Sequence, residues 1–272
     1  MEKTPVEISI EVSGKNLFAE ERQRKIMETI NTNGKAVVPV LCEMFGVSAS
    51  TIRNDLKQLE HKNLITRTHG GAIRNSKAGR ELSPTFKESQ MMPQKKAIAA
   101  AALDLIDNGD IIAVTTGTTT AELLKLLPRK KNLTVIVNDI RSAVWLEDCT
   151  DFHVYMLGGL VRKGYHYTTL PMRNEFLSLV NIDKGFFSCN GFSVERGITA
   201  PDFETAKSVR EILDACFATY LMSDSSKLGT VTFAQIAELG YVNGLIIDSD
   251  IEKEDYSALA AATDVILAEE RD

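Results

Sequence analysis

Two short amphipathic segments joined by Gly46-Val47-Ser48 constrain the folding of this chain more than any other feature. The first segment, residues 39–45, begins with a proline, which a helix tolerates in its first turn. The second runs from Ala49 to about Lys62. Its apolar residues recur at the spacing of one helix face: Ile52, Leu56 and Leu59. Gly46 permits the positive φ that a sharp turn requires, so the pattern predicts two helices in a helix-turn-helix arrangement.

The segments on either side extend this motif. Residues 19–31 have apolar positions at helical spacing and acidic residues in the first turn, which predicts a helix that ends near Asn33-Gly34. A short extended piece, residues 36–38, follows it. After the second helix of the motif, residues 64–72 predict a short β-wing. We therefore expect a small winged helical domain over residues 18–75, preceded by a loose arm over residues 1–17.

The polar face of the second helix points to nucleic acid. Arginine pairs with guanine and asparagine with adenine, while Ser, Thr and Lys contact phosphates. The candidates on or near this face are Ser48, Ser50, Thr51, Arg53, Asn54 and Lys57. In the wing, Arg67 and His69 are placed to reach the DNA backbone or a minor groove. The alternative is an ordinary solvated helix face, with His69 a simple turn residue.

The charge distribution agrees with a nucleic-acid partner for the N-terminal part. Residues 15–80 contain 12 Lys/Arg and 6 Asp/Glu, a balance of +6, whereas residues 81–272 contain 18 and 28, a balance of −10. A small basic unit joined to a larger acidic one is typical of a DNA-binding head on a separate body.

The run from Glu21 through Ala72, with FGVSASTIRNDLKQLEHKNLITRTHGGA at its centre, resembles the winged helix-turn-helix of DeoR-family bacterial transcription regulators. The resemblance implies binding to double-stranded operator DNA, by a homo-oligomer (a dimer or tetramer) and usually for repression. The family commonly has two basic residues where this chain has Arg53-Asn54, so a different operator preference is expected.

The body predicts an α/β domain. Residues 76–92 are polar and are expected to form a linker, and residues 93–272 alternate apolar runs with amphipathic stretches. Such alternation favours a mainly parallel sheet covered by helices. The expected strands are 110–115, 134–138, 153–157, 184–189, 219–223, 244–248 and 265–267. The expected helices are 94–106, 119–127, 140–147, 172–180, 204–215 and 257–262.

The loops that follow these strands are where ligands bind in such folds. Residues 115–120, Thr-Thr-Gly-Thr-Thr-Thr, lie between a strand and a helix. Backbone N–H groups and hydroxyls at a helix N-terminus can hold a phosphate, whereas a simple N-cap needs only one threonine. We therefore expect an anion site here. Residues 223–227 add a carboxylate, hydroxyls and an ammonium.

The resemblance extends over this body through GTTT, LTVIVND, ETAKSVREIL and SDSSKLG, which are similar to the DeoR-family sensor domain. That domain is similar to ribose-5-phosphate isomerase and CoA-transferase folds, and it implies a phosphorylated sugar as effector. The effector residues implied are Thr116, Gly117, Thr118, Thr119, Asn138, Gly158, Asn190, Glu204, Lys207, Asp224 and Lys227. Two positions depart from the family pattern: Thr115-Thr116 replaces the usual Asp-Ser, and residues 167–172 lack the usual Ser and Gly.

Two other functions stay open. One is a sugar-phosphate isomerase with Glu204 or Asp224 as general base, although the Asp usual at position 115 is missing. The other is a regulator with a vestigial sensor. We expect no catalytic residue, no metal and no cofactor, because the histidines and the four separated cysteines have no partner at useful spacing. We also expect no membrane partner and a cytoplasmic location.

Overall fold

The computed structural model describes residues 18–33, 35–62, 64–68, 70–74 and 84–269. The chain divides into two compact units, an N-terminal unit of residues 1–82 and a C-terminal unit of residues 83–272. Each unit is described by itself. The arm expected at residues 1–17 and the candidate His69 lie outside the described residues.

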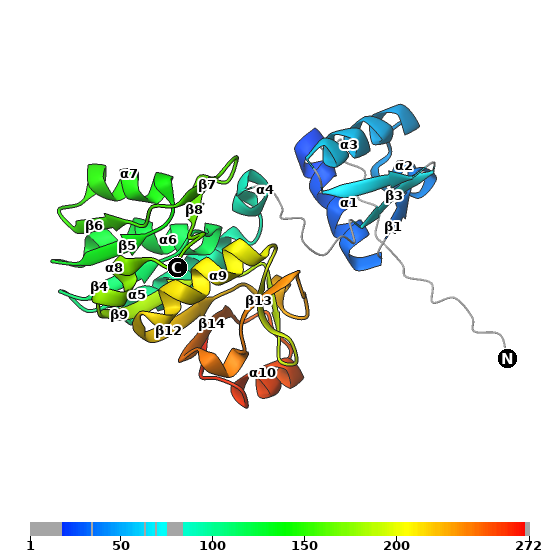
Figure 1. Cartoon of the computed structure of the whole chain (residues 1–272). Coiled ribbons are helices and arrows are strands. Elements are labelled where there is room, and N and C mark those ends of the chain that lie inside the picture. Colours follow the sequence, from blue (N-terminus) through cyan, green and yellow to red (C-terminus); the bar gives the residue numbers. More distant parts are fainter. Residues whose placement is uncertain (1–17, 34, 63, 69, 75–83, 270–272) are drawn as a thin grey trace. The chain divides into compact units, whose positions relative to one another are not determined.

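The N-terminal unit is a winged helix-turn-helix, as predicted (Figure 1). Its elements are α1 (Ala19–Asn33), β1 (Lys35–Val37), α2 (Val38–Phe45), α3 (Ala49–His61), β2 (Ile65–Thr68) and β3 (Gly71–Arg74). The strands form an antiparallel sheet in the order β1-β3-β2. Gly46 ends α2 with φ 63°, the left-handed conformation that glycine adopts without steric cost. The core is formed by fully buried aliphatic side chains from the three helices: Ile26, Ile30, Leu41, Ile52, Leu56 and Leu59.

The C-terminal unit is built on a seven-stranded sheet in the order β15-β14-β12-β9-β4-β5-β6. Its strands are β4 (Ile111–Val114), β5 (Thr134–Val137), β6 (His153–Met156), β9 (Ile182–Phe187), β12 (Cys216–Met222), β14 (Gly244–Asp248) and β15 (Val265–Ala268). All the neighbouring strands of this sheet pair in parallel. The expected fold class, a winged helix-turn-helix joined to a mainly parallel α/β domain, is therefore confirmed.

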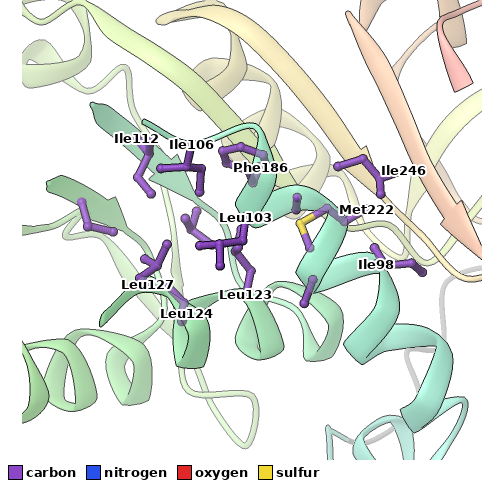
Figure 2. Packing of buried hydrophobic residues seen from close by; sticks show 14 of the residues in the cluster. Ile98, Leu103, Ile106, Ile112, Leu123, Leu124, Leu127, Phe186, Met222 and Ile246 are labelled. Carbon is purple, nitrogen blue, oxygen red and sulfur yellow. The ribbon is translucent and has the colours of Figure 1, made fainter. Parts of the chain in front are cut away.

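Helices cover both faces of this sheet. They are α5 (Met92–Asp104), α6 (Thr118–Leu126), α7 (Ile140–Cys149), α8 (Glu175–Leu179), α9 (Phe203–Asp214) and α10 (Lys253–Ala260). Figure 2 shows the larger core cluster, in which Ile98 and Leu103 of α5 and Leu123 of α6 pack against apolar side chains of the sheet. The labelled strand residues are Ile112, Phe186, Met222 and Ile246. A second cluster packs α9 against residues of the sheet and of a smaller sheet beside it.

The structure differs from the sequence-based expectation at several places, among them α10, which begins at Lys253 and not at residue 257 as expected. The polar segment expected to be a linker contains a helix, α4 (Pro84–Ser89), and the start of α5. The helix expected over residues 172–180 begins only at Glu175, because the Asn174 side chain accepts from the Phe176 N–H and caps it there. Two small antiparallel additions were not predicted: the hairpin of β7 (Leu160–Arg162) and β8 (Tyr167–Thr169), and a sheet of β10 (Gly191–Ser193), β11 (Gly197–Ala200) and β13 (Ala234–Ala237). In the described residues, no helix is both long and apolar enough to cross a membrane.

Candidate nucleic-acid interface and candidate effector site

Helix α3 buries its apolar residues and exposes its polar ones, as the sequence predicts. Ile52, Leu56 and Leu59 are buried against the rest of the N-terminal unit. Arg53, Asn54 and Lys57, which follow the other helix face, are exposed. The donors and acceptors of these three side chains are therefore available to base edges and phosphates.

The N-terminal end of α3 presents hydroxyls. Ser48 caps the helix, because its Oγ accepts a hydrogen bond from the Thr51 N–H at 3.2 Å. The same Oγ lies 2.7 Å from Ser50 Oγ and 2.9 Å from Thr51 Oγ1. This end of a helix attracts anions through its dipole and unpaired N–H groups. Ser48, Ser50 and Thr51 therefore form one hydroxyl cluster at this end of the helix.

A buried polar network fixes α3 against α1. Asp55 is 2% exposed and receives hydrogen bonds from Arg22 Nε at 2.6 Å and Arg22 Nη2 at 3.2 Å. Gln23 reaches Asp55 and Gln58, and Lys62 donates to Gln23. Paired arginine–carboxylate bonds impose both distance and orientation. The sequence does not reveal this network, because the partners of Asp55 lie 32 and 33 positions away in another helix.

A groove of about 410 Å³ lies between α3 and the wing. Arg53 and Arg67 line it from the two sides, together with Glu60. Glu60 accepts from the Arg67 backbone N–H at 3.2 Å and faces its guanidinium at 3.5 Å. Arg67 is exposed, so the sheet positions its backbone while its charge remains on the surface.

In the C-terminal unit, the order of the strands singles out one edge of the sheet. From β4 the chain moves to β5 and β6 in one direction, and from β9 it moves to β12, β14 and β15 in the other. Between β4 and β9 the strand order therefore reverses. Ligands of open parallel sheets bind beyond the carboxyl ends of the strands at such a switch point.

The loop after β4 lies at this point. Gly117 precedes α6, and an added Cβ would lie 2.0 Å from Ser188 Oγ, which follows β9. Thr120 Oγ1 donates to the carbonyl oxygens of Thr115 (2.8 Å) and Gly117 (3.0 Å). Thr115 Oγ1 is buried and has no hydrogen-bond partner among the described residues. A buried hydroxyl without a hydrogen-bond partner is energetically costly.

Asn138 and Asp139, which follow β5, hold this loop in place. Asn138 Oδ1 accepts from the Thr116 N–H at 2.8 Å, and its Nδ2 donates to the Thr168 carbonyl at 3.1 Å. Asp139 Oδ2 accepts from Thr116 Oγ1 at 3.1 Å, while its Oδ1 caps α7 at the Ser142 N–H. The Asn138 side chain is 2% exposed, so its part in the site is to position Thr116.

The loops after β9 and β12 bring further groups to the same edge. Asp224 is 2% exposed and accepts from Ser226 Oγ. Burial raises the pKa of the Cys189 thiol to about 12, and the nearby Lys227 ammonium opposes this shift. Asp248, at the end of β14, accepts from the Ser225 N–H at 2.7 Å and was not predicted. An ammonium and two carboxylates therefore gather beside the switch point.

Helix α9 begins at the carboxyl edge of the sheet, because it leads directly into the start of β12 and runs antiparallel to that strand. Glu204 is exposed in its first turn. Lys207 Nζ donates to the carbonyl oxygens of Leu170 (3.3 Å) and Pro171 (3.0 Å). Arg162, from β7, was not predicted and pairs with Asp202, the N-cap of α9. The altered segment, residues 167–172, contacts α9 near both ends, because Tyr167 Oη also lies 3.1 Å from Thr205 Oγ1.

Two candidates occupy more ordinary positions. Gly158 is exposed after β6, with open space around its Cα. Asn190 is half-buried after β9, and its N–H donates to the Thr199 carbonyl at 3.2 Å. The structure places both after strands of the sheet, at its carboxyl edge.

Together these features define a class of protein. A basic winged helix-turn-helix with an exposed polar helix face is joined to an α/β unit with polar loops at its switch point, which is the plan of a ligand-responsive transcription regulator. The family described as DeoR-like helix-turn-helix domain matches residues 22–78, and the DeoR C terminal sensor domain matches residues 90–249. The chain belongs to the DeoR family.

Similar proteins have the same plan over nearly their whole length. The chain is 31% identical to the HTH-type transcriptional regulator GlpR of Haloferax volcanii over 89% of this chain and 94% of that protein. It is 33% identical to the Lactose phosphotransferase system repressor of Staphylococcus epidermidis, over 86% and 94% respectively. It is 31% identical to the HTH-type transcriptional repressor GlcR of Bacillus subtilis, over 85% and 89%.

Solved structures are similar only at a distance. A ribose 5-phosphate isomerase from Plasmodium falciparum is 17% identical and matches 50% of this chain and 52% of that chain, with a TM-score of 0.37. The eIF2B delta subunit from Chaetomium thermophilum is 12% identical and matches 84% and 71%, with a TM-score of 0.44. Both scores are too low to support an argument about function.

Proposed function

We propose that this chain is a repressor that places α3 in the major groove of an operator. The observation that supports this most directly is the exposed row of Arg53, Asn54 and Lys57 on a helix whose opposite face is fixed by the Asp55–Arg22 pair. The N-terminal part of the second helix is the part of such a motif that enters the groove. Ser48, Ser50 and Thr51 would contact phosphates, and Arg67 with His69 would extend the contacts along the wing.

The effector we propose is a phosphorylated sugar bound at the carboxyl edge of the sheet. The Thr116–Thr119 loop and the start of α6 supply N–H groups and hydroxyls for the phosphate, and the unpartnered Thr115 hydroxyl supports a ligand at this position. Lys227 adds a positive charge. Relatives whose names include a lactose phosphotransferase system repressor agree with a sugar-related signal.

The remaining candidates would surround the sugar. Asp224 and Asn190 offer polar groups from the loops after β12 and β9, and Glu204 lies at the start of α9. In this proposal Asn138 and Lys207 position other residues and do not contact the sugar. Their polar atoms already form hydrogen bonds with Thr116 and with residues 170–171. Gly158 would allow the ligand close to the backbone after β6.

The chain is proposed to act by binding and not by catalysis. Its relatives are named as transcriptional regulators, and the position before the phosphate loop that would offer a carboxylate is Thr115. A homo-oligomer is proposed because helix-turn-helix heads pair with repeated half-sites. The proposed place of action is the cytoplasm, where the operator DNA is.

Ligand and operator binding are tested in two steps. Thermal unfolding is followed with glucose 6-phosphate, fructose 1-phosphate, fructose 6-phosphate and ribose 5-phosphate, and with each free sugar. A phosphate-dependent rise of Tm is expected, because a ligand that binds the folded state stabilises it. A duplex selected from a random pool by the purified protein should then be released by the same compound.

Two variants make this test specific. Thr118→Glu places a carboxylate at the proposed phosphate position, and Lys227→Ala removes the ammonium. Both should keep the affinity for the selected duplex and lose release by the sugar phosphate. If release survives in both variants, the effector does not bind at this edge.

A further inference from the structure

Lys95 is a buried lysine that the proposed DNA and effector contacts do not use. It lies in the first half of α5 and is only 3% exposed. Burying an ammonium is costly unless it is paired or hydrogen-bonded. A buried lysine at this place therefore needs a reason beyond packing, because an apolar side chain of similar length would fill the same space without that cost.

The ammonium of Lys95 closes the corner between α4 and α5. Its Nζ donates to the Lys87 carbonyl and, at 2.7 Å, to the Gln90 carbonyl. These carbonyls belong to the end of α4 and to the turn that follows, and the Lys87 carbonyl also accepts from the Gln90 N–H at 3.3 Å. The turn itself is unusual, since Met91 has φ 52°, a conformation that a non-glycine residue adopts only when its surroundings impose it. Lys95 thus holds the first described element after residues 75–83, the stretch that joins the two units.

The charges facing Lys95 come from the candidate effector site and from α4 and α6. Asp224 and Lys227 belong to the loop after β12, Lys87 to α4 and Glu122 to α6. The pKa of Lys95 is lowered to about 8, mainly by burial; Asp224 and Glu122 oppose this shift, whereas Lys227 and Lys87 contribute to it. Its charge therefore responds to groups proposed to contact the effector.

We propose that Lys95 couples the effector site to the interdomain junction: an anion bound beside Asp224 and Lys227 strengthens the hold of the Lys95 ammonium on the carbonyls of α4. This inference rests on the proposed effector site and adds how its occupancy is transmitted. An anion near an ammonium favours its charged form, and a charged donor makes a stronger hydrogen bond than a neutral one. Occupancy of the effector site then changes how stably α4 is folded, and α4 is the element next to residues 75–83.

Hydrogen exchange of the backbone amides of residues 88–91 tests this inference in the full chain. Without ligand, protection corrected for the intrinsic rate should fall as the pH rises through about 8, because the Lys95 ammonium loses its proton. In Lys95→Met these amides should exchange about threefold to tenfold faster at pH 7, with no such midpoint. Lys96→Met, which changes the exposed neighbour on the same helix, should match the wild type.

Further variants separate coupling from a purely structural role. Asp224→Asn removes a carboxylate that raises the pKa of Lys95, so the midpoint should move to lower pH. Inorganic phosphate, used as the probe, should move the wild-type midpoint upward and have no effect in Lys95→Met. Lys227→Met should lose the phosphate effect and keep a ligand-free midpoint, moved upward because a neighbouring positive charge is gone.

The possible results distinguish a failure of the inferred coupling from a failure of the proposed effector site. Three results would overturn the inference. The amides of residues 88–91 could exchange at the wild-type rate in Lys95→Met, or the pH midpoint of their exchange could stay unchanged in Asp224→Asn. Phosphate could also raise Tm without changing the exchange of these amides. If phosphate does not raise Tm at all, the proposed effector site fails, and the transmission inferred from it fails too. In that case the pH midpoint of exchange without ligand still reports whether the Lys95 ammonium binds the carbonyls of Lys87 and Gln90.

Discussion

At the scale of single residues, charged side chains that are close together in one helix differ sharply in their burial. Asp55 and Arg53 are two positions apart on α3, yet Asp55 is 2% exposed and paired whereas Arg53 faces solvent. The helical period explains this, because positions two apart lie on different faces. The exposed member is available to DNA, and the buried member orients it.

Arg53→Ala should weaken binding to the selected operator duplex by about 1–3 kcal/mol if Arg53 contacts a base edge. The loss should be largest for the preferred sequence and should relax discrimination at one position. Binding is measured by fluorescence anisotropy with the preferred duplex and a scrambled one. The control is Arg24→Ala, which removes another exposed arginine, from α1. Equal affinity of the two variants would exclude Arg53 from sequence recognition.

Cysteine reactivity reports on the candidate effector site without any ligand. Because the pKa of Cys189 is raised to about 12, its thiolate is scarce at neutral pH. We expect iodoacetamide to label the exposed Cys149 first and Cys189 much more slowly, with the rate for Cys189 still rising with pH well above 9. Peptide mass spectrometry after timed labelling measures both in one sample. Similar rates for the two thiols at pH 7 would contradict the buried environment.

At the scale of helices and strands, position is set by a small number of polar contacts between apolar faces. The Asp55–Arg22 pair joins α3 to α1, and the Asn138 amide joins the loop after β4 to the strand β8. Apolar packing alone would allow the helices to slide, whereas such hydrogen bonds have a fixed geometry. We therefore expect their loss to affect both stability and function.

Asp55→Ala should destabilise the N-terminal unit by about 3–5 kcal/mol, because it leaves the buried Arg22 charge without its carboxylate. Glu28→Ala is the matched control: it removes the carboxylate of the exposed Arg24–Glu28 pair, which contributes only about 0.3–0.5 kcal/mol. Urea unfolding followed by circular dichroism measures both. Equal midpoints for Asp55→Ala and Glu28→Ala would show that the pair does not hold α3.

Gly117→Ala should destabilise the C-terminal unit by about 1–3 kcal/mol, the usual cost of overfilling a packed site. The added Cβ would lie 2.0 Å from Ser188 Oγ and 2.9 Å from Thr120 Oγ1. Ser188→Gly removes the nearest atoms, so the double variant should recover most of the stability. If the double variant remains as unstable as Gly117→Ala, the close approach of β4 and β9 loops is not the reason for the glycine.

The sequence determined more of the N-terminal unit than of the candidate effector site, and the reason is physical. Gly46 and the Ile52–Leu59 stripe act within one or two turns, so their effects are visible in a local pattern. The contacts of Asn138 and Arg162 join residues 22 to 40 positions apart. The segment of α4 was missed for a similar reason, since its end is held by Lys95 and not by its own polar composition.

At the scale of the whole molecule, two units with separate cores share one chain. The core of the N-terminal unit is formed by residues such as Ile26 and Leu41, and the clusters of the C-terminal unit are formed by residues after position 96. The Asp55 network and the Gly117 contacts belong to different units and involve different residues. Changes at such independent sites are expected to add.

Calorimetry of the full chain should therefore show that each variant acts on its own unit. Asp55→Ala should lower one unfolding transition and Gly117→Ala the other, and the double variant should show both shifts, additive within about 0.5 kcal/mol. A sugar phosphate that binds the C-terminal unit should raise only the transition that Gly117→Ala lowers, because a ligand stabilises the structure it binds. A rise in both transitions on adding the sugar phosphate would instead mean that the stabilities of the two units are coupled. In that case the effector would act on the DNA-binding surface through a continuous folded body, and the Lys95 corner would not be needed to explain the response.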